Sequence, residues 1–236
     1  MIFSETAVTR VDDFDSCGRM LPNAILTLLE NTASHHTAAV GADAQNGTVW
    51  ILTQWRVEIC RRPEAGETLR SETWSLSRGG TVSAERGFFL KNSAGEILVR
   101  AQADFVLMDL NAGRILRADE ELMERYAPEE LRPFSDKLPR LRLRAQFERE
   151  LPLHVRRTDI DFNGHVHNTR YLDYAMEMLP DGLDAVGAVK AFRIVYHSSL
   201  RHGDEAYLRA YEDGDELKIG IFVGDKLYTA ISLSMK

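Results

Sequence analysis

The residues with the clearest capacity for chemistry lie within five positions of one another. Asp161, Asn163 and His165 occupy alternate places in one short segment, with Gly164 between the last two. A carboxylate, an amide and an imidazole are groups that proteins use to activate water, to attack a carbonyl carbon and to orient or polarise the reacting group. Their spacing predicts a catalytic turn.

Backbone groups of the same segment are expected to complete this site. A strand is predicted before the turn and a helix after it, and the free N–H groups and dipole of a helix start favour negative charge. We expect the amides of Gly164 and Val166 to form an oxyanion hole, with Gly164 admitting a ligand close to the backbone. Asp161 then acts either as general base on water or as nucleophile, and the sequence leaves both routes open.

The first half of the chain predicts one long helix followed by four strands. Apolar residues recur at helical spacing over residues 23–40, and Pro22 precedes them as a helix start signal. His36 shares this apolar stripe and is predicted to be a satisfied core histidine or a pocket-facing one. Strand-like runs separated by turn sequences follow, at residues 49–59, 68–77, 82–91 and 97–108.

The order of a helix followed by four strands returns in the second half, after a charged stretch that contains three prolines. A strand is predicted at residues 153–157 and a helix at 168–179, followed by strands near 190–197, 205–211, 217–223 and 227–233. We therefore expect an N-terminal domain at 1–125, a linker at 126–148 and a C-terminal domain at 149–236 that carries the active site.

A comparison of the two halves supports an internal duplication. The segment at residues 15–18 matches residues 161–164 at an offset of 146 positions (from 15 to 161), and downstream motifs match at 137 positions (from 56 to 193). The first copy, however, places Asp15, Cys17 and Arg19 where the second has the carboxylate, amide and imidazole. The prediction is one active site per chain, and an α+β fold in which each half is an antiparallel sheet wrapped round a long central helix.

Several segments of the chain resemble plant and bacterial acyl-ACP thioesterases. They are residues 157–168 with Tyr171 and Leu172, and, in the first half, residues 50–53, 56–59, 66–67 and 72–74 with Pro63. The resemblance implies a tandem (double) hotdog fold, a role in fatty acid biosynthesis, and release of fatty acyl chains from acyl carrier protein. It also implies that the family's catalytic Asp, Asn and His are Asp161, Asn163 and His165.

One departure from the family pattern affects the expected mechanism. The family has a Glu-Cys pair with catalytic roles where this chain has Ser199 and Leu200. Asp161 is then the only carboxylate available to activate water, or His197 assists it, because strand alternation is expected to place His197 and Ser199 on one face. These two residues are predicted as accessory site residues.

Other kinds of site find little support. The spacing of Asp159, Asp161 and Asn163 imitates the start of an EF-hand loop, but Arg170 stands where that loop needs a bidentate Glu. His165 and His167 have no further zinc ligands in a motif, and His167 is predicted to cap or pack. No Walker loop, GxGxxG or G-x-S-x-G motif occurs, so neither a metal nor a cofactor is expected.

Composition narrows the expected partners. The balance of 44% hydrophobic and 28% charged residues is that of a globular protein, and the net charge of −7 disfavours nucleic acid. No apolar run is long enough for a membrane span and the N-terminus lacks signal-peptide features, so a cytoplasmic protein is predicted. The one concentrated basic stretch contains Arg140, Arg142 and Arg144, which either steers an acidic carrier protein or is a solvated face.

The sequence therefore predicts a thioesterase that converts acyl-acyl carrier protein to free fatty acid and holo-ACP. Two alternatives stay open: an acyl-CoA thioesterase on the same fold, and a weakly active or non-catalytic module that binds acyl groups or the carrier protein. Because the duplication supplies an internal pair, either a monomer or a homodimer is expected.

Overall fold

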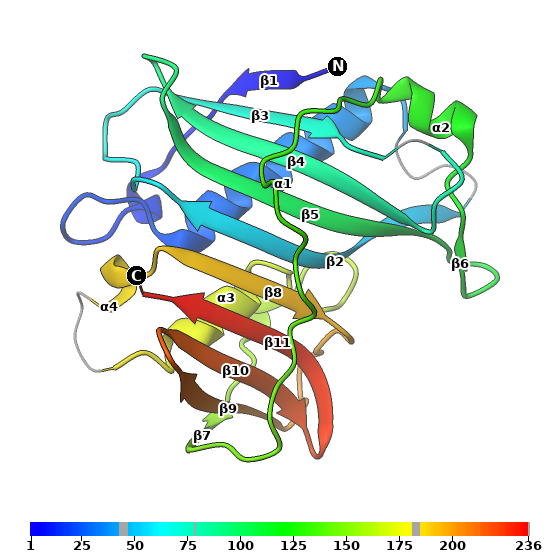
Figure 1. Ribbon diagram of the computed structural model, residues 1–236. Helices are drawn as coiled ribbons and strands as arrows, with labels where there is room; N and C mark the ends of the chain where they lie inside the picture. Colours follow the sequence, from blue (N-terminus) through cyan, green and yellow to red (C-terminus); the bar gives the residue numbers. More distant parts are fainter. Residues whose placement is uncertain (43–46, 78, 181–184, 236) are drawn as a thin grey trace. The chain divides into compact units, whose positions relative to one another are not determined.

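The computed structural model describes residues 1–42, 47–77, 79–180 and 185–235. The chain divides into two compact units, one formed by Met1–Met20 and Ala24–Lys137, the other by Leu21–Asn23 and Leu138–Lys236. Each unit combines an antiparallel sheet with helices, so the predicted α+β class is confirmed (Figure 1). The domain limits inferred from the sequence stay a prediction.

The described residues of the first unit form the longer helix and six strands. Its sheet has the order β1-β3-β4-β5-β2 with β6 paired to β5, and every pairing is antiparallel. The helix α1 runs across one face of this sheet (Figure 1). The elements are β1 (Phe3–Thr6), a 3-10 helix (Val11–Asp13), α1 (Pro22–Ala39), β2 (Thr48–Ile59), β3 (Leu69–Ser75), β4 (Ser83–Asn92), β5 (Ile97–Asp109), β6 (Arg114–Leu116) and α2 (Glu120–Arg125).

Helix α1 confirms the helix predicted at residues 23–40. Its apolar stripe is buried, with Ile25 and Leu29 fully inaccessible to solvent, and burial of such side chains contributes about 1.5–3 kcal/mol each. The Thr32 hydroxyl donates to Ser71 of β3 at 2.8 Å, which ties the helix to the sheet. Gly41 follows the helix with a φ of 64°, a usual helix-ending conformation. Within the described ranges no helix, α1 included, has the length and apolarity of a membrane span.

The second unit repeats this arrangement with a shorter helix. Its strands lie in the order β7-β9-β10-β11-β8, so each occupies the place of its counterpart in the first unit. The duplication predicted from the sequence is thus present in the strand order. The elements are β7 (Arg149–Leu153), a 3-10 helix (Arg157–Asp159), α3 (Arg170–Met176), α4 (Ala185–Ala188), β8 (Ala191–Tyr196), β9 (Ala206–Asp213), β10 (Glu216–Val223) and β11 (Lys226–Ser234).

Two predicted elements of the second half differ from the structure. The strand predicted at 153–157 is wrong, because β7 ends at Leu153 and the chain then turns into the 3-10 helix. The turn is fixed by Asp159, whose carboxylate accepts the Arg156 backbone N–H at 2.9 Å. The helix predicted at 168–179 is shorter, since α3 starts at Arg170 after the N-cap residue Thr169 and ends at Met176.

Strand β6 and helix α2 are among the elements of the first unit that were not predicted. Strand β6 pairs with β5 through only three residues, and helix α2 has six. The start signal of α2 is nevertheless present, since the Asp119 carboxylate accepts the Leu122 N–H at 2.7 Å. Such short elements carry too little periodicity to stand out from a charged segment.

Candidate functional site

The segment 161–165 forms a closed turn, here called the C-terminal turn. The flanking residues Ile160 and Val166 pair as an antiparallel bridge. The Asp161 N–H donates to the His165 carbonyl at 2.8 Å, and the Gly164 N–H donates to the Asp161 carbonyl at 3.0 Å. Gly164 has a φ of 77°, the left-handed region in which glycine carries no steric penalty. The glycine is therefore required by the turn itself.

The Asp161 carboxylate organises the predicted catalytic residues. Its Oδ1 accepts the backbone N–H of Asn163 at 2.8 Å and that of His165 at 3.3 Å. Its Oδ2 is 3.5 Å from the Asn163 amide nitrogen. In the described part of the chain no cation lies within ion-pair distance of Asp161. Oδ1 thus holds the turn together through hydrogen bonds, whereas no positively charged side chain of the described residues pairs with Oδ2.

The predicted oxyanion hole does not agree with this geometry. The Gly164 N–H is used by the Asp161 carbonyl, and the Val166 N–H donates to the Leu200 carbonyl at 2.8 Å. Both donors therefore already have acceptors within the protein, and a ligand would have to displace them. For Gly164 the cause is the closed turn itself, and for Val166 it is tertiary structure, because the Leu200 carbonyl comes from a segment far along the chain.

The predicted accessory residues lie just beyond a strand end. β8 stops at Tyr196, and the N–H groups of His197 and Ser198 both donate to the Tyr228 carbonyl, at 2.8 and 3.1 Å. The side chains of His197 and Ser199 are exposed, whereas Leu200 is fully buried. Both side chains are therefore exposed because they lie in a loop, and not because they alternate along a strand as predicted. A catalytic role for either residue stays a prediction.

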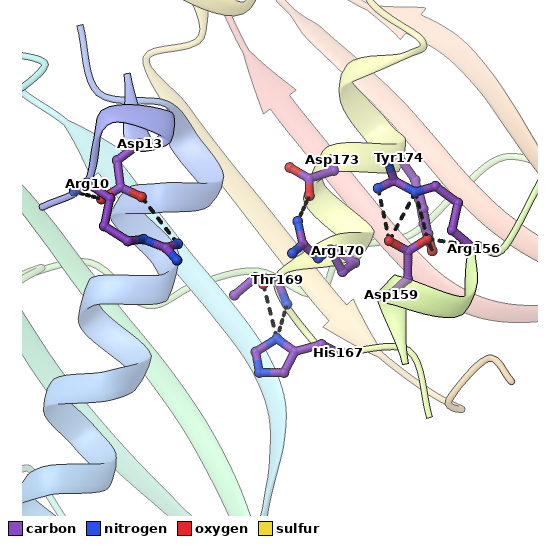
Figure 2. A network of polar contacts seen from close by, with 9 residues as sticks. All are labelled: Arg10, Asp13, Arg156, Asp159, His167, Thr169, Arg170, Asp173 and Tyr174. Atoms are coloured by element: carbon purple, nitrogen blue, oxygen red, sulfur yellow. Dashed lines mark hydrogen bonds and ion pairs between the residues drawn. The ribbon is translucent and has the colours of Figure 1, made fainter. Parts of the chain in front are cut away.

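A buried carboxylate that sequence reasoning did not assign to the site supports the start of the turn. Asp159 is 1% exposed, and its carboxylate accepts hydrogen bonds from the Arg156 guanidinium and, at 2.8 Å, from the Tyr174 hydroxyl (Figure 2). Burial alone would raise the pKa of Asp159, but these hydrogen bonds outweigh it and hold the pKa below its ordinary value. Asp159 is thus a structural anion, which explains its EF-hand-like spacing without a metal.

The residues after the turn start helix α3. The Thr169 N–H and the Thr169 hydroxyl both lie within hydrogen-bond distance of the His167 Nδ1, at 3.4 and 3.1 Å (Figure 2). The His167 ring thus lies beside the N-cap residue of α3, and its predicted role in capping or packing stays a prediction. Across the described ranges, no group of three or more His, Cys, Asp or Glu side chains is arranged to hold a metal ion.

The first unit contains the same turn at residues 15–19, here called the N-terminal turn. The Asp15 N–H donates to the Arg19 carbonyl at 2.9 Å, and the Gly18 N–H donates to the Asp15 carbonyl at 2.9 Å. The Asp15 Oδ1 accepts the N–H groups of Cys17 and Arg19, both at 2.9 Å. Gly18 has a φ of 74°. Bond for bond, this is the frame of the C-terminal turn.

The two turns differ in what faces the second carboxylate oxygen. In the N-terminal turn the Arg62 guanidinium donates to the Asp15 Oδ2 at 3.1 Å, and Arg62 is only 7% exposed. Burial would raise the pKa of Asp15, but the turn N–H groups and the charge of Arg62 keep it below its ordinary value. This carboxylate is therefore neutralised by the buried Arg62, and the Arg19 Nε lies 3.5 Å from the same oxygen.

Backbone bonds identify the counterpart of Arg62 in the second unit. The Met20 N–H donates to the Pro63 carbonyl at 2.8 Å, as the Val166 N–H does to the Leu200 carbonyl. Pro63 therefore corresponds to Leu200, and Arg62 to Ser199. At the position from which an arginine neutralises Asp15, the second unit has a small, uncharged side chain.

Outside the turns, His36 is buried in the core, as one of the two predictions for it stated, but only its Nδ1 has a hydrogen-bond partner among the described residues. It stacks on Phe3 with ring centroids 5.2 Å apart, and its Nδ1 lies 2.9 Å from the Arg86 guanidinium. Burial and the charge of Arg86 lower the pKa of His36 to about 4. The ring is thus neutral at physiological pH and accepts a hydrogen bond from Arg86.

Comparison with known proteins identifies the class. Two structures that share this architecture are an acyl-ACP thioesterase from Bacteroides thetaiotaomicron (TM-score 0.86, 19% identity, 100% of this chain and 98% of the other) and a putative oleoyl thioesterase from Lactobacillus plantarum (TM-score 0.80, 23% identity, 99% and 95%). At these identities the likeness establishes the fold, and the chain is a tandem hotdog protein.

Family models then place the chain more narrowly. The acyl-ACP thioesterase N-terminal domain matches residues 1–126 and the C-terminal domain matches residues 143–220, so the chain belongs to the acyl-ACP thioesterase family. The chloroplastic oleoyl-acyl carrier protein thioesterase 2 of Arabidopsis thaliana is 27% identical over 202 residues, which are 76% of this chain and 54% of that protein. The chain thus spans little more than half the length of this curated relative.

Proposed function

We propose that this protein hydrolyses the thioester of acyl-acyl carrier protein, releasing a free fatty acid and holo-ACP, and that the C-terminal turn is its active site. The observation that carries the proposal is the contrast between two turns with one hydrogen-bonded frame. Only the C-terminal turn adds an amide and an imidazole to its carboxylate and lacks the neutralising arginine. Family membership supports the choice of reaction.

In the proposed reaction the Asp161 Oδ2 is the reacting oxygen. As general base it takes a proton from water while the water oxygen bonds to the thioester carbonyl carbon. The C–S bond of the resulting intermediate then breaks, and the leaving sulfur receives a proton. Asn163 and His165, adjacent on the turn, orient the water or polarise the carbonyl.

The alternative route uses the same oxygen as a nucleophile. The Asp161 Oδ2 bonds to the carbonyl carbon and expels the thiol, and water then hydrolyses the mixed anhydride. Trapping of the mixed anhydride with hydroxylamine distinguishes the two routes, and a single turnover in ¹⁸O-labelled water adds positive evidence for the nucleophilic route when label enters Asp161. Label enters the Asp161 carboxylate only if water attacks the enzyme's carboxyl carbon, whereas in the general-base route it appears only in the fatty acid.

The proposed partner is an acyl carrier protein, and the basic stretch offers a docking segment. Arg144 is partly engaged within the chain, since its guanidinium bonds Glu148 and, at 3.0 Å, the Gln146 carbonyl. Arg140 and Arg142 are exposed and are the better candidates for long-range steering. Reversing both charges is expected to raise the KM for acyl-ACP and leave that for acyl-CoA unchanged.

Two other readings of the site are tested by the same assay. An acyl-CoA thioesterase would turn over acyl-CoA at least as well as acyl-ACP and would not respond to the Arg140 and Arg142 reversals. A non-catalytic acyl or carrier-protein binding module is favoured by Ser199 and Leu200, which stand where the family has its catalytic Glu-Cys pair. That reading predicts binding of acyl-ACP without turnover.

The decisive experiment measures thiol release from acyl-ACP over a panel of chain lengths. The proposal expects release by the wild type and at most trace release by Asp161→Asn, which keeps the shape of the side chain. If no substrate yields free thiol, or if Asp161→Asn is as fast as the wild type, the proposal is wrong. A monomeric or homodimeric state and a cytoplasmic location stay predictions, the first of which light scattering decides.

A further inference from the structure

The helix after the proposed catalytic turn carries two buried tyrosines that point back to it. Tyr171 and Tyr174 lie three residues apart on α3, a spacing that places them on one helix face, and they are 1% and 5% exposed. The Tyr174 hydroxyl donates to Asp159, at the entrance of the turn.

Tyr171 reaches the exit of the turn through Leu200. The Leu200 N–H donates to the Tyr171 hydroxyl at 2.7 Å, while the Leu200 carbonyl accepts the Val166 N–H at 2.8 Å. Leu200 therefore connects α3 to the residue that follows His165. Burial raises the pKa of Tyr171 to about 12, so the hydroxyl stays protonated and acts as a hydrogen-bonding group.

The N-terminal turn lacks this connection at both ends. At the offset of 146 positions, Tyr171 corresponds to Ile25 (from 25 to 171) and Tyr174 to Leu28 (from 28 to 174). Leu200 corresponds to Pro63, which has no N–H to donate. The donor and the acceptor of the bond are thus absent together in the copy that lacks the catalytic set, and present together in the copy that has it.

We infer that Tyr171 is a positioning residue of the proposed active site, fixing through Leu200 the place of Val166 and with it the His165 end of the turn. Tyr174 likewise fixes the start of the turn, through its hydrogen bond to Asp159. This inference rests on the proposed function for its kinetic consequence, but its structural content is independent of the substrate. The hydroxyl acts on the turn and does not itself touch the reacting atoms.

If the Tyr171 hydroxyl only stabilised the fold by accepting the Leu200 N–H, its removal would lower stability without affecting the turn. The test therefore needs a matched control that loses a similar hydrogen bond away from the turn. Tyr211 provides it, because its hydroxyl accepts the backbone N–H of Arg144 at 3.1 Å, in the same unit and with 3% exposure. Tyr171→Phe and Tyr211→Phe each delete one buried hydroxyl and leave one N–H without its acceptor, with an expected cost of about 1–3 kcal/mol.

The experiment compares kcat, KM and backbone hydrogen exchange in the two variants. Tyr171→Phe is expected to lower kcat about 10- to 100-fold with KM unchanged, and to speed exchange in residues 161–166 and at Leu200. Tyr211→Phe should keep the wild-type kcat and the wild-type exchange of the turn. Tyr174→Phe should resemble Tyr171→Phe and speed exchange from Asp159 onward.

Equal kcat values in Tyr171→Phe and Tyr211→Phe would overturn the inference, as would unchanged exchange of the turn in Tyr171→Phe. If the wild type hydrolyses no thioester, the proposed function fails, and the exchange data still decide the positioning role. Faster exchange at the turn in Tyr171→Phe, with wild-type exchange in Tyr211→Phe, would then support it.

Discussion

The N-terminal and C-terminal turns share a backbone and differ in chemistry. Both use an aspartate Oδ1 to accept two turn N–H groups and a glycine with positive φ to close the loop. In the first, a buried arginine engages the second oxygen. In the second, a serine occupies the corresponding position, and two tyrosine hydroxyls form hydrogen bonds with residues next to the turn. A duplicated frame can therefore serve as scaffold in one copy and, as we propose, as catalyst in the other.

The largest effect is expected from replacing Asp161 with asparagine, with the same replacement of Asp15 as the comparison. Asp161→Asn should lower kcat by about 10²- to 10⁴-fold, because the uncharged amide neither accepts a proton from water nor attacks the carbonyl. Asp15→Asn should retain kcat and lower the melting temperature. Steady-state kinetics and thermal unfolding of both variants check this, and loss of kcat in Asp15→Asn would contradict the division of roles.

Removal of Arg62 should destabilise the first unit without affecting catalysis. Arg62→Met removes the buried cation from Asp15, which keeps only Arg19 among the described residues, and leaves the Met20 carbonyl without its side-chain donors. We expect a loss of about 3 kcal/mol in the free energy of unfolding. Urea denaturation measures the loss, and thiol release should remain at the wild-type rate. A variant as stable as the wild type would show that the Asp15–Arg62 pair is not what holds the N-terminal turn.

The first unit should also be the more sensitive to acid, because of His36. Its pKa lies near 4 when folded and at about 6.5 when unfolded, so the folded state binds fewer protons. The stability that depends on a neutral His36 is fully present above pH 6.5 and falls as the pH drops towards 4. The free energy of unfolding is expected to decrease by about 2 kcal/mol by pH 5. Denaturant unfolding at pH 7 and pH 5 checks this.

His36→Gln is the matched control for that titration. Glutamine offers Arg86 an acceptor but has no proton to gain. The difference in stability between pH 7 and pH 5 should shrink by about the amount attributed to His36. An undiminished difference would assign the acid sensitivity to other groups.

The smallest expected effect comes from giving the C-terminal turn the arginine of its counterpart. Ser199→Arg should place a guanidinium near Asp161, stabilise its charged form and lower kcat about tenfold. Ser199→Gln is the uncharged control of similar length and should fall much less. Comparable losses in both variants would mean that side-chain size at this position matters and charge does not.

Much of the architecture followed from local patterns in the chain. The helix at residues 23–40 and the four strands after it were predicted closely, because a helix period and a strand period are visible along the sequence itself. The strand predicted at 153–157 failed because Leu153 and Val155 alternate like strand residues, although Asp159 turns the chain there. Elements of three to six residues, β6 and α2, left no readable pattern.

The sequence by itself determined the duplication, the fold class and the two turns, since an aspartate followed three residues later by a glycine specifies such a turn through local hydrogen bonds and a positive φ. Only the tertiary structure decided what surrounds each aspartate. Arg62 reaches Asp15 across 47 positions, and Leu200 with Tyr171 braces the C-terminal turn from elsewhere in the chain. Contacts between distant residues depend on how sheet and helix pack, and no local spacing encodes them.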